Sequence, residues 1–179
     1  MVITRPTLLP DRRAAALACL VTPVLWLISL TVATPPWTLA TLAVATLSVP
    51  LVAWDLIYGR LPNALTLSGY PLTAAVLLAS SSDTPAGPDP WRATLGGALF
   101  FTAHLAIHLT APSSLGGGDV KLSGWLGALL ASISWPSLLQ ATAIAAAITL
   151  ALSVRHNPKS IPHAPGLLIA TWLALLTTP

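Results

Sequence analysis

Apolar segments of about twenty residues recur along the whole chain, and they constrain its fold more than any other feature. They cover residues 14–33, 37–54, 64–80, 92–111, 120–135, 137–154 and 166–178. A helix needs about 20 mostly apolar residues to cross a bilayer, with a range of roughly 17 to 25. Of the 179 residues, 7% are charged, whereas a soluble domain carries about 25%. The sequence therefore predicts an all-α, polytopic membrane helix bundle with about six to seven transmembrane helices.

Short polar or proline-rich connections separate these segments, and the sequence shows no soluble domain and no fixed-period repeat. The segments 120–135 and 166–178 are short for a spanning helix. Residues 120–154 therefore also fit one broken hairpin that lies at a different depth. We predict a single membrane-embedded domain over residues 1–179. Its one cysteine, Cys19, excludes an internal disulfide and a cysteine-based metal site.

The distribution of basic residues predicts the orientation of the bundle, because cytoplasmic loops carry an excess of lysine and arginine. With the N-terminus in the cytoplasm, the basic residues on the cytoplasmic side are Arg5, Arg12, Arg13, Arg60, Lys121, Arg155 and Lys159. Arg92 falls on the other side, beside Asp83 and Asp89. This orientation places Asp55 and Asp119 at the cytoplasmic ends of two helices.

Asp55 and Asp119 are the candidate catalytic residues, because a carboxylate close to hydrocarbon is costly and marks a functional site. For one such aspartate alone, the more frequent reason is a charge solvated at the headgroups. Two carboxylates brought together cannot easily both ionise. The charged one can activate a water, and the protonated one can donate to a peptide carbonyl, without metal or cofactor. Gly116 and Gly118 would admit an extended peptide, since glycine permits positive φ and close backbone contact.

The two aspartates stand in motifs that resemble those of the type IV prepilin peptidases. GGGDVKL at 116–122 is similar to that family's GxGD motif, and DLIYGRLPN at 55–63 is similar to its other aspartate motif. The resemblance covers roughly residues 40–170, with both motifs in the family's order. By position it makes Asp55 and Asp119 the catalytic pair. The motif or substrate-loop residues that it implies are Gly116, Gly118, Lys121, Leu61, Pro62 and Asn63.

The resemblance implies a GxGD-type aspartic endopeptidase that removes short basic leaders from prepilins and pseudopilins. The expected location is the cell inner or cytoplasmic membrane, with the site at the cytoplasmic face. The expected partners are a precursor peptide and membrane lipid; no nucleic acid, metal or cofactor is implied, and the oligomeric state is left open. Larger members carry an N-terminal region with paired cysteines and also methylate the pilin. Because 13 residues precede the first apolar segment here, we expect a short form without that region and without S-adenosylmethionine binding.

A metal site, a different protease class and a non-enzymatic protein are the alternatives to an aspartic peptidase. His104 and His108 lie four residues apart, a spacing that can bind zinc, but the sequence offers no evident third ligand and no glutamate as base. Hydrogen bonding between helices is the simpler role for both histidines. A rhomboid-type serine protease is disfavoured because no GxSG is present, and the LPN and VKL contexts favour the prepilin branch over presenilin-type proteases. The non-enzymatic alternative is a polytopic protein, either an inactive pilin-precursor-binding protein or a transporter-like subunit.

Overall fold

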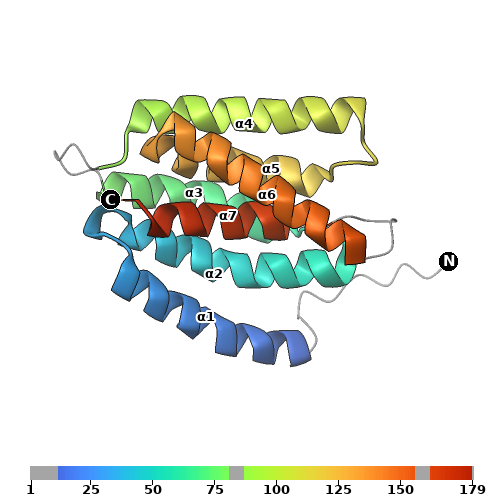
Figure 1. Ribbon diagram of the computed structural model, residues 1–179, viewed down its shortest axis with the longest axis horizontal. Coiled ribbons are helices and arrows are strands. Elements are labelled where there is room, and N and C mark those ends of the chain that lie inside the picture. The colour runs from blue at the N-terminus through green and yellow to red at the C-terminus, as the bar shows by residue number, and fades with distance from the viewer. Residues whose placement is uncertain (1–11, 81–86, 156–161, 179) are drawn as a thin grey trace.

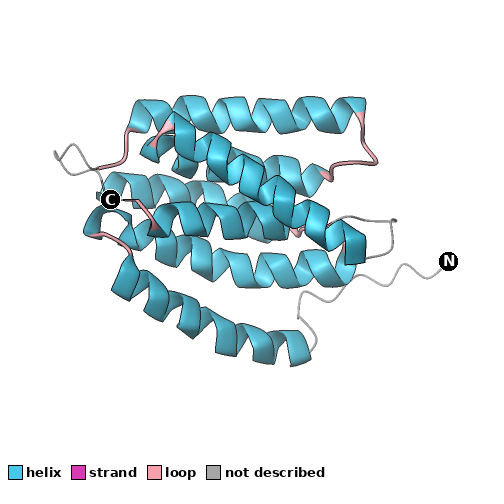
Figure 2. Cartoon of the chain, viewed as in Figure 1, coloured by secondary structure: helices cyan, strands magenta, loops and turns pink. Residues whose placement is uncertain are grey.

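The computed structural model describes residues 12–80, 87–155 and 162–178. Every regular element in this part of the chain is a helix (Figure 2). The helices are α1 (Arg12–Val32), α2 (Pro35–Tyr58), α3 (Asn63–Ser80), α4 (Pro90–Thr110), α5 (Gly117–Ile133), α6 (Trp135–Arg155) and α7 (Ala164–Leu176). The predicted all-helical bundle is therefore confirmed.

Each predicted apolar segment corresponds to one of these helices. The α5 and α6 helices are separate, because Ser134 between them is extended, with φ −170° and ψ 159°. Among the described residues, three helices are long and apolar enough to cross a membrane by length and composition: Pro35–Tyr58, Pro90–Thr110 and Trp135–Ser153. Two shorter apolar helices cover Ala18–Val32 and Ala164–Leu176. The composition and these helices identify a membrane protein.

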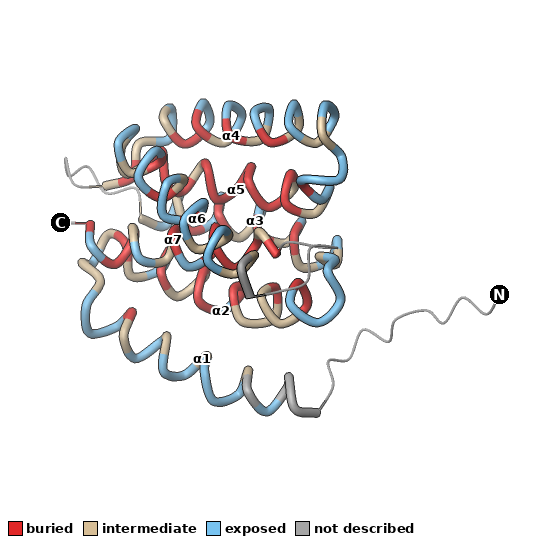
Figure 3. Tube along the Cα trace, turned by 45° about the vertical axis from the view of Figure 1, so that its right-hand side comes forward, coloured by how far each residue is buried: buried red, intermediate tan, exposed pale blue. Residues whose placement is uncertain are grey.

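The α5 helix lies inside the bundle, and twelve of its 17 residues are buried. It packs on α3, α4, α6 and α7, whereas α2 packs on α1, α3 and α7. The α1 and α4 helices form opposite edges of the molecule (Figure 1). Most of α1 is exposed, in contrast to the buried α5 (Figure 3). The helix that begins with the second aspartate motif is therefore the centre of the bundle.

Small residues bring α4 and α5 into close contact. A Cβ atom added to Gly96 would overlap the Cβ of Ala131, and one added to Gly97 would lie 2.9 Å from the carbonyl oxygen of Gly124. Small residues at a helix interface allow backbones to approach closely, which is the usual way that helices associate in membranes. This contact holds α5 rigidly against its antiparallel neighbour.

One end of the bundle gathers three helix ends that are far apart in the sequence. The C-terminal end of α2 and the N-terminal ends of α5 and α7 lie on the right-hand side of the view in Figure 1. At this end the helices α2, α4 and α6 finish, and α3, α5 and α7 begin (Figure 1). The two aspartate motifs therefore meet at a common face of the bundle.

Candidate active site

Asp55 lies in the last turn of α2. The helix extends to Tyr58, four residues beyond the predicted end of that apolar segment, and ends at Gly59. Gly59 has φ 59°, and its amide donates to the carbonyl oxygen of Asp55 at 2.9 Å. This left-handed conformation is the common way to end a helix and favours glycine. The cap fixes the backbone of Asp55. This residue is buried, with 7% of its surface exposed.

Asp119 lies in the first turn of α5, just before the apolar segment 120–135. Gly116 is the N-cap of this helix, and the amide of Asp119 donates to the carbonyl oxygen of Gly116 at 3.0 Å. A carboxylate in the first turn interacts favourably with the positive end of the helix dipole. Asp119 is 8% exposed. Burial of both aspartates in the protein rules out two separate charges solvated at the headgroups.

The charge of Asp55 acts on the carboxyl group of Asp119. Burial, and then the negative charge of Asp55, raise the pKa of Asp119 from 3.8 to about 7, while a hydrogen bond with the backbone of Gly116 opposes the increase. A like charge raises the pKa of an acid because it disfavours the second ionised group. Asp119 therefore holds a proton over much of the pH range in which a free aspartate is ionised.

Each carboxylate also keeps one oxygen available. Asp55 Oδ2 and Asp119 Oδ1 are buried and have no hydrogen-bond partner among the described residues. The backbone amide of Ala164, the first residue of α7, donates to the Asp55 carboxylate. A buried polar atom without a partner in a folded protein needs a physical reason, of which a catalytic role is one. Asp55 and Asp119 therefore each have a buried oxygen without a partner among the described residues.

The remaining motif residues bring the two motifs into contact. Leu61 packs on Gly118, where an added Cβ would lie 2.8 Å from the Cβ of Leu61. Lys121 Nζ donates to Asn63 Oδ1 at 2.7 Å. Pro62 precedes α3, and its carbonyl oxygen accepts from the amide of Thr66 at 3.1 Å. The sequence could not show the contacts between the motifs, which join residues that are about sixty positions apart.

The role predicted for the loop glycines is partly wrong. Among the described residues, Gly59 is the glycine with positive φ, and Gly116 has φ −72°. Gly118 is instead needed for space, because its Cα faces Leu61 without room for a side chain. The close approach that the sequence predicted was that of a substrate peptide, and this stays a prediction.

The two histidines of α4 were expected to form hydrogen bonds with other helices. Among the described residues, both instead bond to backbone carbonyl oxygens in α4 or in the connection that follows it. His104 Nδ1 donates to the carbonyl oxygen of Phe100 in its own helix at 2.8 Å. His108 Nδ1 donates to that of Leu115, in the α4–α5 connection, at 2.7 Å. In the described residues, no three His, Cys, Asp or Glu side chains lie close enough to bind a metal. His104 has a different neighbour, the ring of His163, at a centroid distance of 6.1 Å.

Comparison with known protein families shows which family the chain belongs to. The model of the type IV leader peptidase family matches residues 42–154, which include both aspartates and both motifs. The chain belongs to the type IV leader peptidase family. This confirms the resemblance carried by the two motifs.

Two curated relatives of the type IV leader peptidase are similar to the chain. Both are named prepilin leader peptidase/N-methyltransferase, one from Aeromonas salmonicida (strain A449) and one from Aeromonas salmonicida. Each is 35% identical over 151 residues, which are 80% of this chain and 51% of the relative. The chain thus spans about half the length of the curated relatives it matches. No solved structure matches it.

Two elements of this candidate site were missed in the sequence. Pro165 signals a helix start, since proline is favoured in the first turn, and the amides at such a start attract anions. That signal could have suggested the contact of Ala164 with Asp55. Tyr70 was also missed; its hydroxyl donates to the carbonyl oxygen of Lys121 at 2.9 Å. An isolated tyrosine within an apolar segment gives no sequence signal of such a contact.

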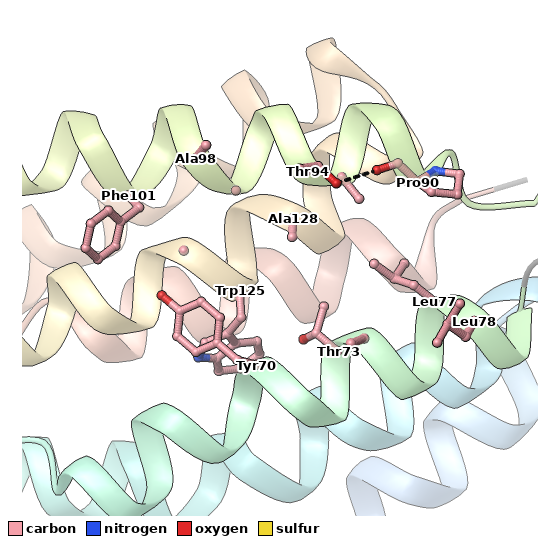
Figure 4. A pocket seen from close by; sticks show the side chains of 14 residues that line it. Tyr70, Thr73, Leu77, Leu78, Pro90, Thr94, Ala98, Phe101, Trp125 and Ala128 are labelled. Atoms are coloured by element: carbon pink, nitrogen blue, oxygen red, sulfur yellow. Dashed lines mark hydrogen bonds between the residues drawn. The ribbon is translucent and has the colours of Figure 1, made fainter.

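A cavity of about 640 Å³ lies beside the site, between α3, α4 and α5 (Figure 4). Tyr70 of α3 and Trp125 of α5 lie next to each other on its wall, opposite Phe101 of α4. The hydroxyl of Thr94, which also lines it, donates to the carbonyl oxygen of Pro90 at 2.9 Å. Neither aspartate lines this cavity. It borders the candidate site through Tyr70, which contacts the backbone of the second motif.

Proposed function

We propose that this chain is a GxGD-type aspartic endopeptidase that cleaves short basic leaders from prepilin or pseudopilin precursors. The single observation that supports this most is the burial of Asp55 and Asp119 together at one end of the bundle. Residues 1–179 are taken as one membrane-embedded peptidase domain with the N-terminus in the cytoplasm. The site then faces the cytoplasm from the cell inner membrane, and its partners are the precursor peptide and membrane lipid.

In the proposed reaction the two aspartates have different roles. Asp55, whose carboxylate accepts from the amide of Ala164, is the charged general base that takes a proton from water. Asp119, with its pKa near 7, donates its proton to the carbonyl oxygen of the scissile peptide. The water oxygen bonds to the carbonyl carbon to give a tetrahedral gem-diol. As the carbon–nitrogen bond then breaks, the proton on Asp55 passes to the leaving amine, and a hydroxyl proton of the gem-diol returns to Asp119. This is the division of labour of aspartic protease dyads.

The proposal is tested by replacing each aspartate with asparagine, which keeps the shape but cannot exchange a proton. The wild-type chain is co-expressed with a pilin-like precursor that has a short basic leader, and cleavage is followed by the shift in precursor mass. We expect Asp55→Asn and Asp119→Asn each to lower the rate at least about a hundredfold, since general acid–base catalysis contributes about that much or more. Membrane insertion should be unchanged.

Asp89→Asn is the matched control. Asp89 caps α4 by accepting from the amides of Trp91 and Arg92, and asparagine is an equally good cap. This variant should cleave at the wild-type rate. Full cleavage by either dyad variant would refute the mechanism. If well-folded wild-type chain cleaves no pilin-like precursor, the non-enzymatic alternative is favoured.

A further inference from the structure

Asp55 and Asp119 are on helices that depend on shared neighbours for their relative position. The α2 helix packs on α1, α3 and α7, and α5 packs on α3, α4, α6 and α7. The α3 helix is therefore one of two elements that pack on both. It begins at Asn63, eight residues after Asp55 in the chain. Any contact that fixes α3 against the first turn of α5 also fixes one aspartate relative to the other.

Lys121 makes two such contacts with α3. Its ammonium group donates to the side-chain oxygen of Asn63 at 2.7 Å, and its carbonyl oxygen accepts from the hydroxyl of Tyr70 at 2.9 Å. Asn63 and Tyr70 lie seven residues apart, so they are about two turns apart along one face of α3. Lys121, two residues after Asp119, thus contacts α3 at two points along that helix.

The ammonium group of Lys121 does not neutralise either aspartate. Residues two apart on a helix do not face each other, and Lys121 is directed to a neutral amide. Among the described residues, the ion pair in the structure is between Arg92 and Asp89, with Nε and Oδ2 3.4 Å apart. The role of Lys121 is therefore to fix geometry rather than to supply charge to the carboxylates.

We propose that Lys121 is a positioning residue that holds Asp119 in register with Asp55 by joining the first turn of α5 to α3 through Asn63 and Tyr70. This rests on the proposed function, because the register matters for two aspartates that share one water. Small displacements of reacting groups are costly, and an error of about 1 Å can lower a rate roughly a hundredfold. A hydrogen bond that removes such an error affects turnover more than substrate binding.

The test is a double-mutant cycle in purified enzyme, with cleavage of a synthetic basic-leader precursor peptide as the assay. Lys121→Met keeps the length of the side chain and removes the donor, and Asn63→Ala removes the acceptor. We expect each to lower kcat about five- to tenfold, the effect of one hydrogen bond, with KM changed less than about twofold. The double variant should be no slower than the slower single variant, because both remove the same contact. Lys121→Arg should restore most of the activity.

Two controls separate this role from a purely structural one. Thr31→Ala removes an exposed hydrogen bond within α1, from the Thr31 hydroxyl to the carbonyl oxygen of Leu27 at 2.8 Å, without touching the bridge, and should leave kcat unchanged. Tyr70→Phe should lower kcat in the same direction as Lys121→Met. A merely structural Lys121 would lower the amount of folded enzyme and leave kcat per folded molecule unchanged. That result, additive effects in the cycle, or no rescue by arginine would overturn the proposal.

The same cycle is also measured by thermal denaturation in detergent, which needs no substrate. The effects of Lys121→Met and Asn63→Ala on the melting temperature should be non-additive even if no precursor is cleaved. A wild-type chain that shows this coupling but cleaves nothing would refute the proposed function and, with it, the positioning role. A wild-type chain that cleaves the peptide without coupling in either measurement would refute the positioning role alone.

Discussion

Replacing Gly118 with alanine tests the contact between the two motifs most directly. A Cβ at this position would lie 2.8 Å from the Cβ of Leu61 and 3.3 Å from its Cγ and Cδ1. The nearest atom is close to the backbone, so it cannot move away by a change of rotamer. Overpacking of this kind costs about 1–3 kcal/mol. Alanine regains about 0.5–1 kcal/mol as a better helix former than glycine.

The expected net loss of stability for Gly118→Ala is therefore about 0.5–2 kcal/mol. For a chain of this size, that corresponds to a melting temperature lower by roughly 1–8 °C. Cleavage of a precursor peptide should also slow, because α5 and the Leu61 segment must separate and the aspartates move with them. Gly118→Val, with a larger and β-branched side chain, should be slower still.

The neighbouring glycine is a matched control. A Cβ added to Gly117 would lie 3.8 Å from His108 Nε2, which is ordinary van der Waals contact. Gly117→Ala should therefore leave stability unchanged or raise it by up to about 1 kcal/mol. In a Leu61→Gly background, Gly118→Ala should lose most of its cost, because the atom that it meets is gone. Equal melting temperatures and equal rates for Gly117→Ala and Gly118→Ala would refute the reasoning.

The remaining predictions concern charge, packing, metal and topology. Since the pKa of Asp119 is raised from 3.8 to about 7, its protonated form stabilises the fold at low pH, and this stability is lost as the pH rises towards 7. Asp119→Asn should therefore exceed the melting temperature of the wild type by a larger margin near pH 8 than near pH 4; an equal difference at both pH values would contradict the buried charge. Gly96→Ala should lower the melting temperature, because its Cβ overlaps Ala131, and an unchanged value would show that α4 and α5 can separate freely. Chelators should not change the rate of cleavage by the purified enzyme, and a loss restored by a metal would exclude the aspartic mechanism. Reporter fusions after residues 60 and 117 should be cytoplasmic and one at 86 external; a cytoplasmic signal at 86 would invert the orientation.

The helices and the candidate dyad could be found in the sequence because the membrane imposes simple rules. Apolar length predicts where helices lie, and the seven segments correspond to the seven helices of the described chain. The carboxylates of Asp55 and Asp119 stand out against an apolar background. Their motifs carried the family resemblance that the match over residues 42–154 confirms. These properties depend on local sequence, so no knowledge of the packing was needed.

The contacts around the dyad could not be found in this way, because they depend on which faces of the helices meet. A helix that is apolar on all sides shows no pattern that identifies its buried face. Only the packed bundle brings the amide of Ala164 to Asp55 and the side chain of Leu61 to Gly118. The packing also shows why position 118 is glycine, which the sequence pattern alone attributes in part to positive φ. Apolar composition thus determined that the chain forms membrane helices with two acids near their ends, whereas side-by-side packing decided which groups hold those acids together.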